Sequence, residues 1–146
     1  MGLLITEFPK VIVQDMEAQA AEVVKFIIRR TWQNLTLPPE EGGTPRATGY
    51  ASASWIISIG EPSDQVGGEK STAFGSYAHV VDYGPAREGL DALRAYTLDQ
   101  GSVFLVNNTP YIRRLNFGWS KQAQAGFVDR AEVQARNEAD EKFRNL

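Results

Sequence analysis

The chain has 146 residues, 42% of them hydrophobic, which is enough for one hydrophobic core, and we expect a single domain over residues 1–146. Because the chain has no cysteine, disulfides and thiolate metal sites are excluded. The 15 basic and 18 acidic residues are nearly balanced, which argues against a nucleic-acid-binding protein, and no apolar run approaches the roughly 20 residues that span a bilayer.

The first third of the chain is predicted to form one long helix. Apolar residues from Met16 to Ile28 recur at three- and four-residue steps within residues 15–36, which marks one helical face. Asp15 is placed to cap the start of this helix, and the prolines after Leu37 end it. Residues 10–13 fit either a short strand or an early helical turn.

The middle of the chain is predicted to alternate loops with one strand. Residues 38–49 are rich in proline and glycine and form a loop. From 51 to 59 the apolar period changes to two, which places Trp55 on the core face of a strand and puts Ser52 and Ser54 on its outer face. Residues 60–76 form a second polar loop, and its unusual length leads us to expect that it orders against a neighbouring subunit.

The last third is predicted to hold three helices and a strand. A helix runs from Gly84-Pro85 to about Leu98, with an inner stripe made of Ala86, Leu90, Leu93 and Thr97. Residues 103–106 form a strand buried on both faces. A short helix starts at Pro110, with Asn108 or Thr109 as its cap, and ends at Gly118. A loop over 119–126 leads to the final helix.

The final helix, over residues 127–144, carries a thin apolar stripe, so we expect it to pack on a partner. Three pairs spaced four apart favour the helix, namely Glu132–Arg136, Glu138–Lys142 and Asp140–Arg144. One or two further strands are possible near residues 3–13 and 72–81. The predicted fold is therefore α+β, a single domain with a small antiparallel or mixed sheet flanked by a long N-terminal helix and a C-terminal helix.

The sequence offers little for catalysis or cofactor binding. The only histidine, His79, could form a triad with Asp82 and a serine, but no Gly-x-Ser-x-Gly elbow is present, and a locally hydrogen-bonded histidine is the favoured interpretation. Glu40-Glu41 has no third metal ligand nearby, and the glycines at 67–68 lack the spacing of a phosphate-binding loop. We therefore expect no catalytic residue, no metal and no cofactor, and we keep a small hydrolase using His79 as an alternative.

Basic and aromatic residues gather late in the chain. Arg113, Arg114, Lys121 and Arg130 stand near Tyr111, Phe117 and Trp119. Such a mixture can hold a nucleic-acid strand, but arginine, tyrosine and tryptophan are also the residues most enriched in protein–protein hot spots. The protein–protein interpretation is favoured, and DNA would at most pass by this surface.

Two segments together resemble a known family. Residues 44–55, Thr-Pro-Arg-Ala-Thr-Gly-Tyr-Ala-Ser-Ala-Ser-Trp, are similar to the Thr-Pro-x-x-Thr-Gly-x-x-x-x-Ser-Trp segment of phage tail-completion proteins. Residues 106–128 are similar to the family's Asn-Asn-x-Pro-Tyr…Leu-Glu-aromatic-Gly-x-Ser-x-Gln-Ala-Pro-x-Gly segment. The chain departs from the family at Arg46-Ala47, where Val-Asp is common, at Asn116, where Glu is common, and at Gln124, where Pro is common. The last change leaves the 119–126 loop less rigid.

The resemblance gives structural roles to particular residues. Thr48-Gly49 would turn the chain into its strand, and Asn107-Asn108 would end the second strand and cap the helix that follows. The motif positions carried over are Thr48, Gly49, Trp55, Asn107, Asn108, Pro110, Tyr111, Gly118 and Gly126. The expected interface residues are Arg113, Arg114, Trp119, Lys121, Gln122 and Gln124. Trp119 either anchors that interface or folds back onto the core.

The resemblance also implies a function and its partners. It implies a non-enzymatic virion protein that forms a closed ring, of about six subunits, at the head–tail neck of a long-tailed phage. Its partners would be further copies of itself, the head-side connector or stopper proteins, and the tail terminator or tail tube protein. The protein would be made in the host cytoplasm and end in the virion. The alternative within the same joint is the tail terminator itself. The expected contact regions are the 60–76 loop, residues 113–126 and the C-terminal helix.

Overall fold

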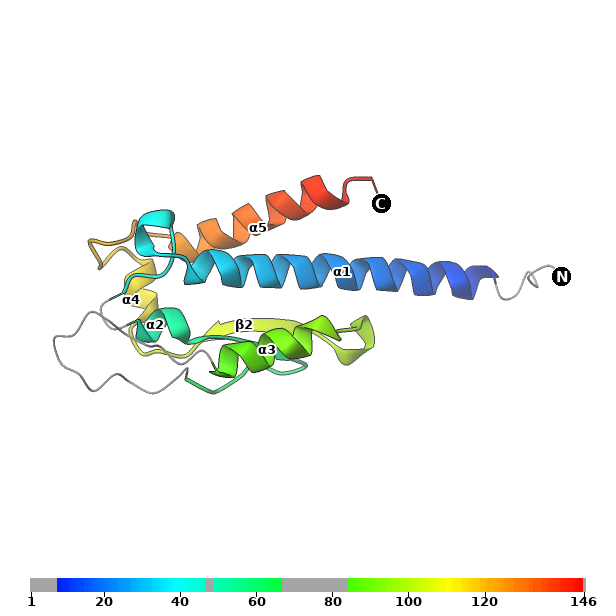
Figure 1. The fold of residues 1–146 in the computed structure, drawn as a ribbon, viewed down its shortest axis with the longest axis horizontal. Coiled ribbons are helices and arrows are strands. Elements are labelled where there is room, and N and C mark those ends of the chain that lie inside the picture. Colours follow the sequence, from blue (N-terminus) through cyan, green and yellow to red (C-terminus); the bar gives the residue numbers. More distant parts are fainter. Residues whose placement is uncertain (1–7, 47–48, 67–83, 146) are drawn as a thin grey trace.

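The protein is built in layers around one long central helix. A computed structural model describes residues 8–46, 49–66 and 84–145. Figure 1 shows helix α1 lying between helix α5 on one side and the sheet with helix α3 on the other. The element order is α1 (Phe8–Thr36), the 3-10 turn η1 (Pro39–Glu41), α2 (Tyr50–Ala53), β1 (Trp55–Ile59), α3 (Gly84–Arg94), the 3-10 turn η2 (Leu98–Gln100), β2 (Val103–Asn107), α4 (Ile112–Asn116) and α5 (Phe127–Phe143). This arrangement confirms the predicted α+β fold.

Helix α1 is longer than predicted. It begins at Phe8, with Pro9 in the first turn, where the missing N–H costs no hydrogen bond. The prediction that Asp15 caps the helix is therefore wrong, because Asp15 lies two turns inside it. Residues 10–13 are helical, so the strand considered for residues 3–13 is also wrong where the structure describes it. None of the helices in the described ranges is both long and apolar enough to cross a bilayer.

The two described strands form one antiparallel ribbon. Trp55 pairs with Asn107 and Ile59 with Val103. The predicted start of the first strand at residue 51 is wrong, because Gly49 at a φ of 81° starts a helical turn instead. Ser54 donates its hydroxyl hydrogen to the Tyr50 carbonyl at 2.6 Å, a bond to the residue four earlier that satisfies the hydroxyl inside the protein.

Burial along the ribbon also differs from the prediction. Ser52 and Ser54, expected on the solvent face, are fully buried because they belong to the turn of α2 that packs inside the protein. Strand β2, expected to be buried on both faces, is half-buried throughout. The reason is that α1 and β1 pack against it, while no other described element makes an extensive contact with it.

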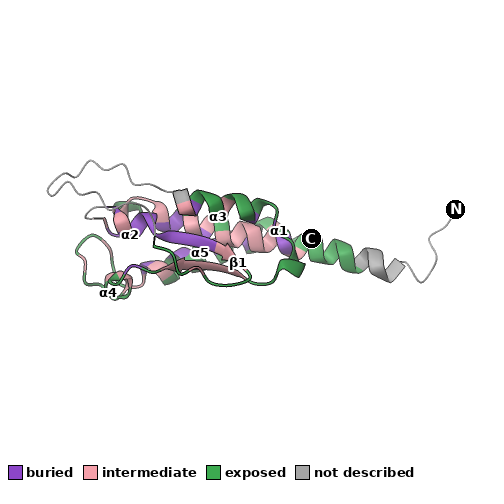
Figure 2. Cartoon of the chain, turned by 90° about the horizontal axis from the view of Figure 1, so that it is seen from below, coloured by how far each residue is buried: buried purple, intermediate pink, exposed green. Residues whose placement is uncertain are grey.

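The hydrophobic core divides into two clusters that share α1. One lies between α1, the ribbon and α3 and contains Ala21, Ile57, Leu93 and Tyr96. The other lies where α1, β1 and α5 meet and contains Leu35, Trp55, Phe127 and Ala131. Figure 2 shows these buried residues concentrated around β1 and the C-terminal half of α1.

Helix α3 is shorter than predicted. It ends at Arg94 instead of about Leu98, because the chain turns into η2, whose start carries a capping box between Thr97 and Gln100. Thr97 is therefore exposed and does not belong to the inner stripe, whereas Ala86 and Leu93 are buried as predicted. The phenol of the buried Tyr96 donates to the Gly101 carbonyl at 2.7 Å and fixes this corner.

Helix α5 packs against α1 of its own domain, and its packing on a partner stays a prediction. Its buried stripe consists of Ala131, Ala135 and Ala139, whose small side chains allow a close approach to α1. The Asn34 amide donates to the Ala131 carbonyl at 3.2 Å. At the far end the rings of Phe26 and Phe143 meet edge to face at 5.7 Å.

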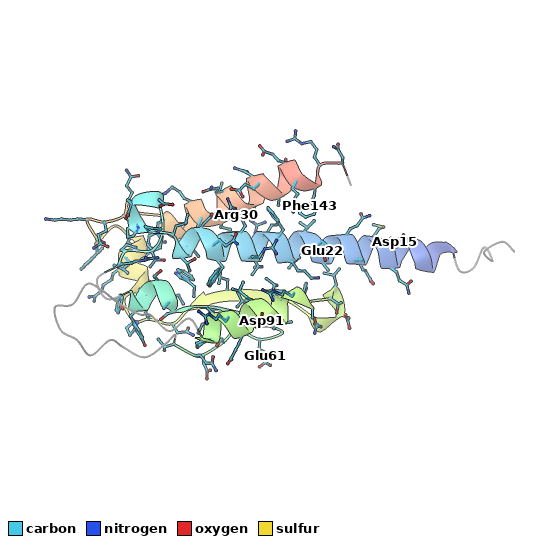
Figure 3. The ribbon with its side chains drawn as sticks, viewed as in Figure 1. Asp15, Glu22, Arg30, Glu61, Asp91 and Phe143 are labelled. Atoms are coloured by element: carbon cyan, nitrogen blue, oxygen red, sulfur yellow. The ribbon has the colours of Figure 1, made fainter. Side chains whose placement is uncertain are left out.

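Ion pairs on α5 follow the prediction only in part. Glu132–Arg136 and Asp140–Arg144 form within the helix, with N–O distances of 2.7 and 3.6 Å. The predicted Glu138–Lys142 pair is wrong, because Glu138 instead accepts two hydrogen bonds from Arg30 of α1. Figure 3 shows Arg30 reaching from α1 toward α5. The hydrogen bond from Arg30 holds the pKa of Glu138 below its usual value.

We expect Glu138→Gln to lower the free energy of unfolding by up to about 1 kcal/mol at pH 7, a small value because both partners are partly exposed. Since the folded-state pKa of Glu138 is lowered, its contribution is present above the unfolded pKa of about 4.3 and is lost as the pH falls through the folded value. Urea unfolding at pH 7 and at pH 3 measures both effects. Glu132→Gln, which breaks a pair inside one helix, is the control and should cost less; an equal loss would contradict the inter-helix role.

The N-terminal end of α1 extends past the rest of the molecule. We call residues 8–19 the arm. Its described side chains, from Val13 to Gln19, are all exposed, whereas Ala21 is buried. Figures 1 and 2 show the arm projecting as a single helix, with the C-terminal end of α5 stopping beside α1 well before the arm's tip. The possible strand at 72–81, His79, Thr48 and most of the second loop lie outside the described residues.

Candidate interaction surface

The predicted interface residues lie on the short helix α4 and in the turn after it, at the end of the molecule opposite the arm (Figure 1). Ile112 and Leu115 anchor α4 by packing against the core cluster that contains Phe127. The predicted cap by Asn108 or Thr109 is wrong. Tyr111 is the residue before the helix and gives no side-chain cap, while the Asn107 side chain accepts hydrogen bonds from the Thr109 N–H and hydroxyl at 3.1 and 2.7 Å.

The turn after α4 has a fixed shape. Gly118 and Gly126 adopt φ values of 91° and 79°, in the left-handed region that side chains disfavour. Asn116 closes the turn twice. Its carbonyl accepts from the Gly126 N–H at 2.7 Å, and its side-chain oxygen accepts from the Val128 N–H at 3.1 Å, a donor in the first turn of α5 that has no partner inside the helix.

Hydrogen bonds with residues outside the turn also hold it in place. The Arg130 guanidinium donates to the Ala125 and Gln124 carbonyls at 2.6 and 3.1 Å. The Gln122 side-chain oxygen accepts from the Arg46 N–H at 2.6 Å, which joins the turn to the segment after η1. These bonds limit the freedom that the absence of proline at position 124 would otherwise allow.

Because its backbone is held from within, the turn can present large side chains to solvent. Trp119 is 75% exposed and Phe117 is 72% exposed, so Trp119 does not fold back onto the core. The Arg114 guanidinium carbon lies 5.2 Å from the centre of the Trp119 ring, a cation–π contact that orients both side chains. Over residues 110–126 the chain has three basic residues and no acidic one. We call Tyr111, Arg113, Arg114, Phe117, Trp119 and Lys121 the aromatic–basic surface.

An apolar hollow of about 360 Å³ borders this surface. Its apolar wall is formed by Trp55, Ile112, Phe117 and Val128. Arg113 lines the same hollow and places a positive charge beside the apolar wall. The hollow is therefore suited to an apolar side chain that is accompanied by a carboxylate.

A second hollow, of about 330 Å³, lies on the other side of α4. Tyr50, Tyr111 and Leu115 line it, together with Arg46 and Gln122. Burial raises the pKa of the Tyr111 phenol, and Tyr50 adds to the rise, so Tyr111 is neutral and able to donate a hydrogen bond at physiological pH.

The predicted interface residues all lie on the surface of one segment. Each of Arg113, Arg114, Trp119, Lys121, Gln122 and Gln124 is exposed. The motif residues have structural positions. Trp55 is 5% exposed and donates its indole N–H to the Thr44 hydroxyl at 2.8 Å. Asn107 donates to the Ala51 carbonyl and Asn108 to the Ser63 and Gln65 carbonyls. Pro110 is exposed at the start of the turn into α4.

Sequence reasoning missed the residues that hold the turn. Nothing in the sequence connects Asn116 with Val128 or Arg46 with Gln122, because these contacts depend on tertiary structure. Arg130 follows Gly118 and Gly126 in the sequence, but this spacing alone does not predict that its guanidinium bonds to the turn between them. Within the described ranges, no group of three or more histidine, aspartate or glutamate residues is placed to hold a metal ion.

No protein-family model, no curated protein and no solved structure matches the chain. The family resemblance of residues 44–55 and 106–128 therefore rests on these two segments themselves.

Proposed function

We propose that this chain is a structural protein of a long-tailed bacteriophage, which assembles as a ring at the head–tail junction and connects the completed tail to the head. It acts by surface contact. One end of the ring faces the head-side connector and the other faces the tail terminator or tail tube.

The observation that supports this proposal most is the placement of the resembling segment 106–128. Its apolar residues anchor α4 in the core, and its internal hydrogen bonds hold the turn that displays Phe117 and Trp119. Large exposed aromatic side chains beside arginine are typical of protein–protein hot spots. A rigid turn loses little conformational entropy on binding, which favours a specific contact.

Mass spectrometry of purified virions tests the proposal directly. We expect the chain in mature particles at low copy, about six per particle if the ring resembles that of the family. Particles that have been stripped of tails and connectors should lack it. Its absence from complete particles would refute the proposal.

We expect Trp119→Ala combined with Lys121→Glu to reduce the joining of heads to tails. Loss of a hot-spot tryptophan costs about 2 kcal/mol or more, roughly a thirtyfold loss of affinity, and the charge reversal adds repulsion against an acidic partner. The measurement is the yield of infectious particles, together with electron microscopy of free heads and free tails.

Leu98→Ala is the matched control, because Leu98 is 36% exposed but lies in η2, away from the aromatic–basic surface and outside the expected contact regions. Its particle yield should equal that of the unmodified chain. If the double variant folds normally and also gives a normal yield, the aromatic–basic surface is not the joining surface.

A further inference from the structure

The arm of α1 exposes apolar side chains that the rest of the helix buries. Val13 is 52% exposed and Met16 is 64% exposed. With 3.6 residues per turn, Val13, Met16 and Ala20 lie on one helical face. The same face continues to Thr31 and Leu35, which are 7% and 0% exposed. The arm therefore repeats the core-facing pattern of α1 where no described part of the chain covers it.

The arm is also acidic. Residues 8–19 contain two acidic residues, Asp15 and Glu17, and one basic residue, Lys10. Glu17 follows Val13 by four residues and so lies one turn along from Val13, at the edge of the apolar face that Val13 and Met16 form. Asp15 lies on the other side of the helix. Figure 3 shows Asp15 on the projecting part of α1. The exposed apolar face of the arm is thus accompanied by one carboxylate, that of Glu17.

The opposite end of the molecule offers an apolar hollow with a positive charge beside it. The apolar hollow walled by Ile112, Phe117 and Val128 has Arg113 beside it. The exposed ring of Phe117 and the flexible thioether of Met16 make a favourable contact when they meet. Segment 110–126 has three basic residues and no acidic one, whereas the arm has two acidic residues and one basic one.

We propose that the arm of one copy of this chain docks into the apolar hollow of the next copy, with Val13 and Met16 against Phe117 and with Glu17 facing Arg113. The two contact regions lie at opposite ends of each molecule (Figure 1), so the contact is head to tail and repeats from copy to copy. Such a contact closes into a ring when the rotation between copies allows it. This assignment rests on the proposed ring and names the two surfaces that form it.

A cross-linking experiment on the full-length chain tests this contact. Since the chain has no cysteine, single substitutions introduce the only thiols. Met16→Cys and Phe117→Cys variants are mixed in equal amounts and mildly oxidised. We expect a covalent dimer in the mixture and little in either variant alone, because a disulfide requires the two Cα atoms to approach within about 7 Å.

The control pair is Met16→Cys mixed with Val133→Cys, which places a thiol at an equally exposed site on α5. It should give no more dimer than the single variants do. Oligomers that form without the 16–117 cross-link would overturn the docking contact while leaving the ring proposal in place. A mixture that stays monomeric and uncross-linked at the highest soluble concentration would also overturn the contact, and virion mass spectrometry would still decide the proposed function.

A charge exchange gives a second test that does not depend on oxidation. Glu17→Arg and Arg113→Glu, each alone, should raise the protein concentration at half-assembly at least about fivefold, because each brings like charges together. The double variant restores the pair in reversed order and should recover most of the assembly. Asp15→Arg is the matched control on the other side of the arm and should have a smaller effect. Failure of the double variant to recover, with both single variants folded, would count against the Glu17–Arg113 pairing.

Discussion

Phe127→Ala is expected to lower the free energy of unfolding by about 3–5 kcal/mol. Phe127 is 0% exposed and is the largest fully buried side chain among the described residues. It starts α5 and packs in the cluster with Leu35, Trp55 and Ala131, which joins α1, β1 and α5. Removing the ring leaves a cavity that the surrounding backbone, held by the Asn116 hydrogen bonds, cannot close.

Thermal and urea unfolding measure this loss, which corresponds to a drop in Tm of about 10 °C. Val133→Ala on the same helix removes a largely exposed side chain and should change the stability by no more than about 0.5 kcal/mol. If Phe127→Ala lowers the free energy of unfolding no more than Val133→Ala does, the cluster that contains Phe127 does not stabilise the packing of α5.

Gly89→Ala should lower the free energy of unfolding by about 1–3 kcal/mol, although the same change in an exposed helix usually increases stability by about 1 kcal/mol. The reason is the close approach of α3 to β1. A Cβ atom at position 89 would lie 2.4 Å from the Ile57 carbonyl oxygen and 3.0 Å from the Ile57 Cβ. A backbone oxygen in the middle of a paired strand cannot move aside, so α3 must lift from the ribbon.

The expected loss of stability distinguishes Gly89→Ala from the same change in an exposed helix, where stability increases. Glu88→Ala, one residue earlier and exposed, changes helix propensity without meeting the ribbon and should be nearly neutral. Urea unfolding of both variants gives the comparison. An increase in stability for Gly89→Ala would mean that α3 does not pack against Ile57 as closely as described.

The sequence alone predicts the helices and strands that are marked by a local pattern of apolar residues, proline or glycine. The spacing of apolar residues predicted α1 and α5, the alternation from Trp55 to Ile59 predicted β1, and Pro85 marked the start of α3. Gly118 and Gly126 marked the ends of the turn, since both adopt the left-handed region that few other residues tolerate. The exposure of the basic and polar side chains in the 113–124 segment was also expected, whereas the sequence left the position of Trp119 open.

The failures involved choices that tertiary contacts decide. Alternation at residues 51–54 indicated a strand, but the hydroxyl of Ser54 bonds to a carbonyl within a helical turn and the serines become part of the core. Glu138 had an acceptable partner four residues later and nevertheless bonds to Arg30, which is over a hundred residues distant in the chain. A glycine inside a helical pattern, such as Gly89, gave no indication of which strand it approaches. For Glu138 and Gly89 the deciding partner is distant in sequence, whereas Ser54 bonds within its own helical turn.

The stiffness of helix α1 constrains any assembly in which a neighbouring subunit binds the arm. After Pro9 it contains neither proline nor glycine up to Thr36, so it has no built-in hinge over a length of about 44 Å. The arm and the body of the protein therefore move as one rigid body. The spacing between neighbouring subunits would be set by this stiff rod, and the curvature of the assembly would have to come from the angle at the joint.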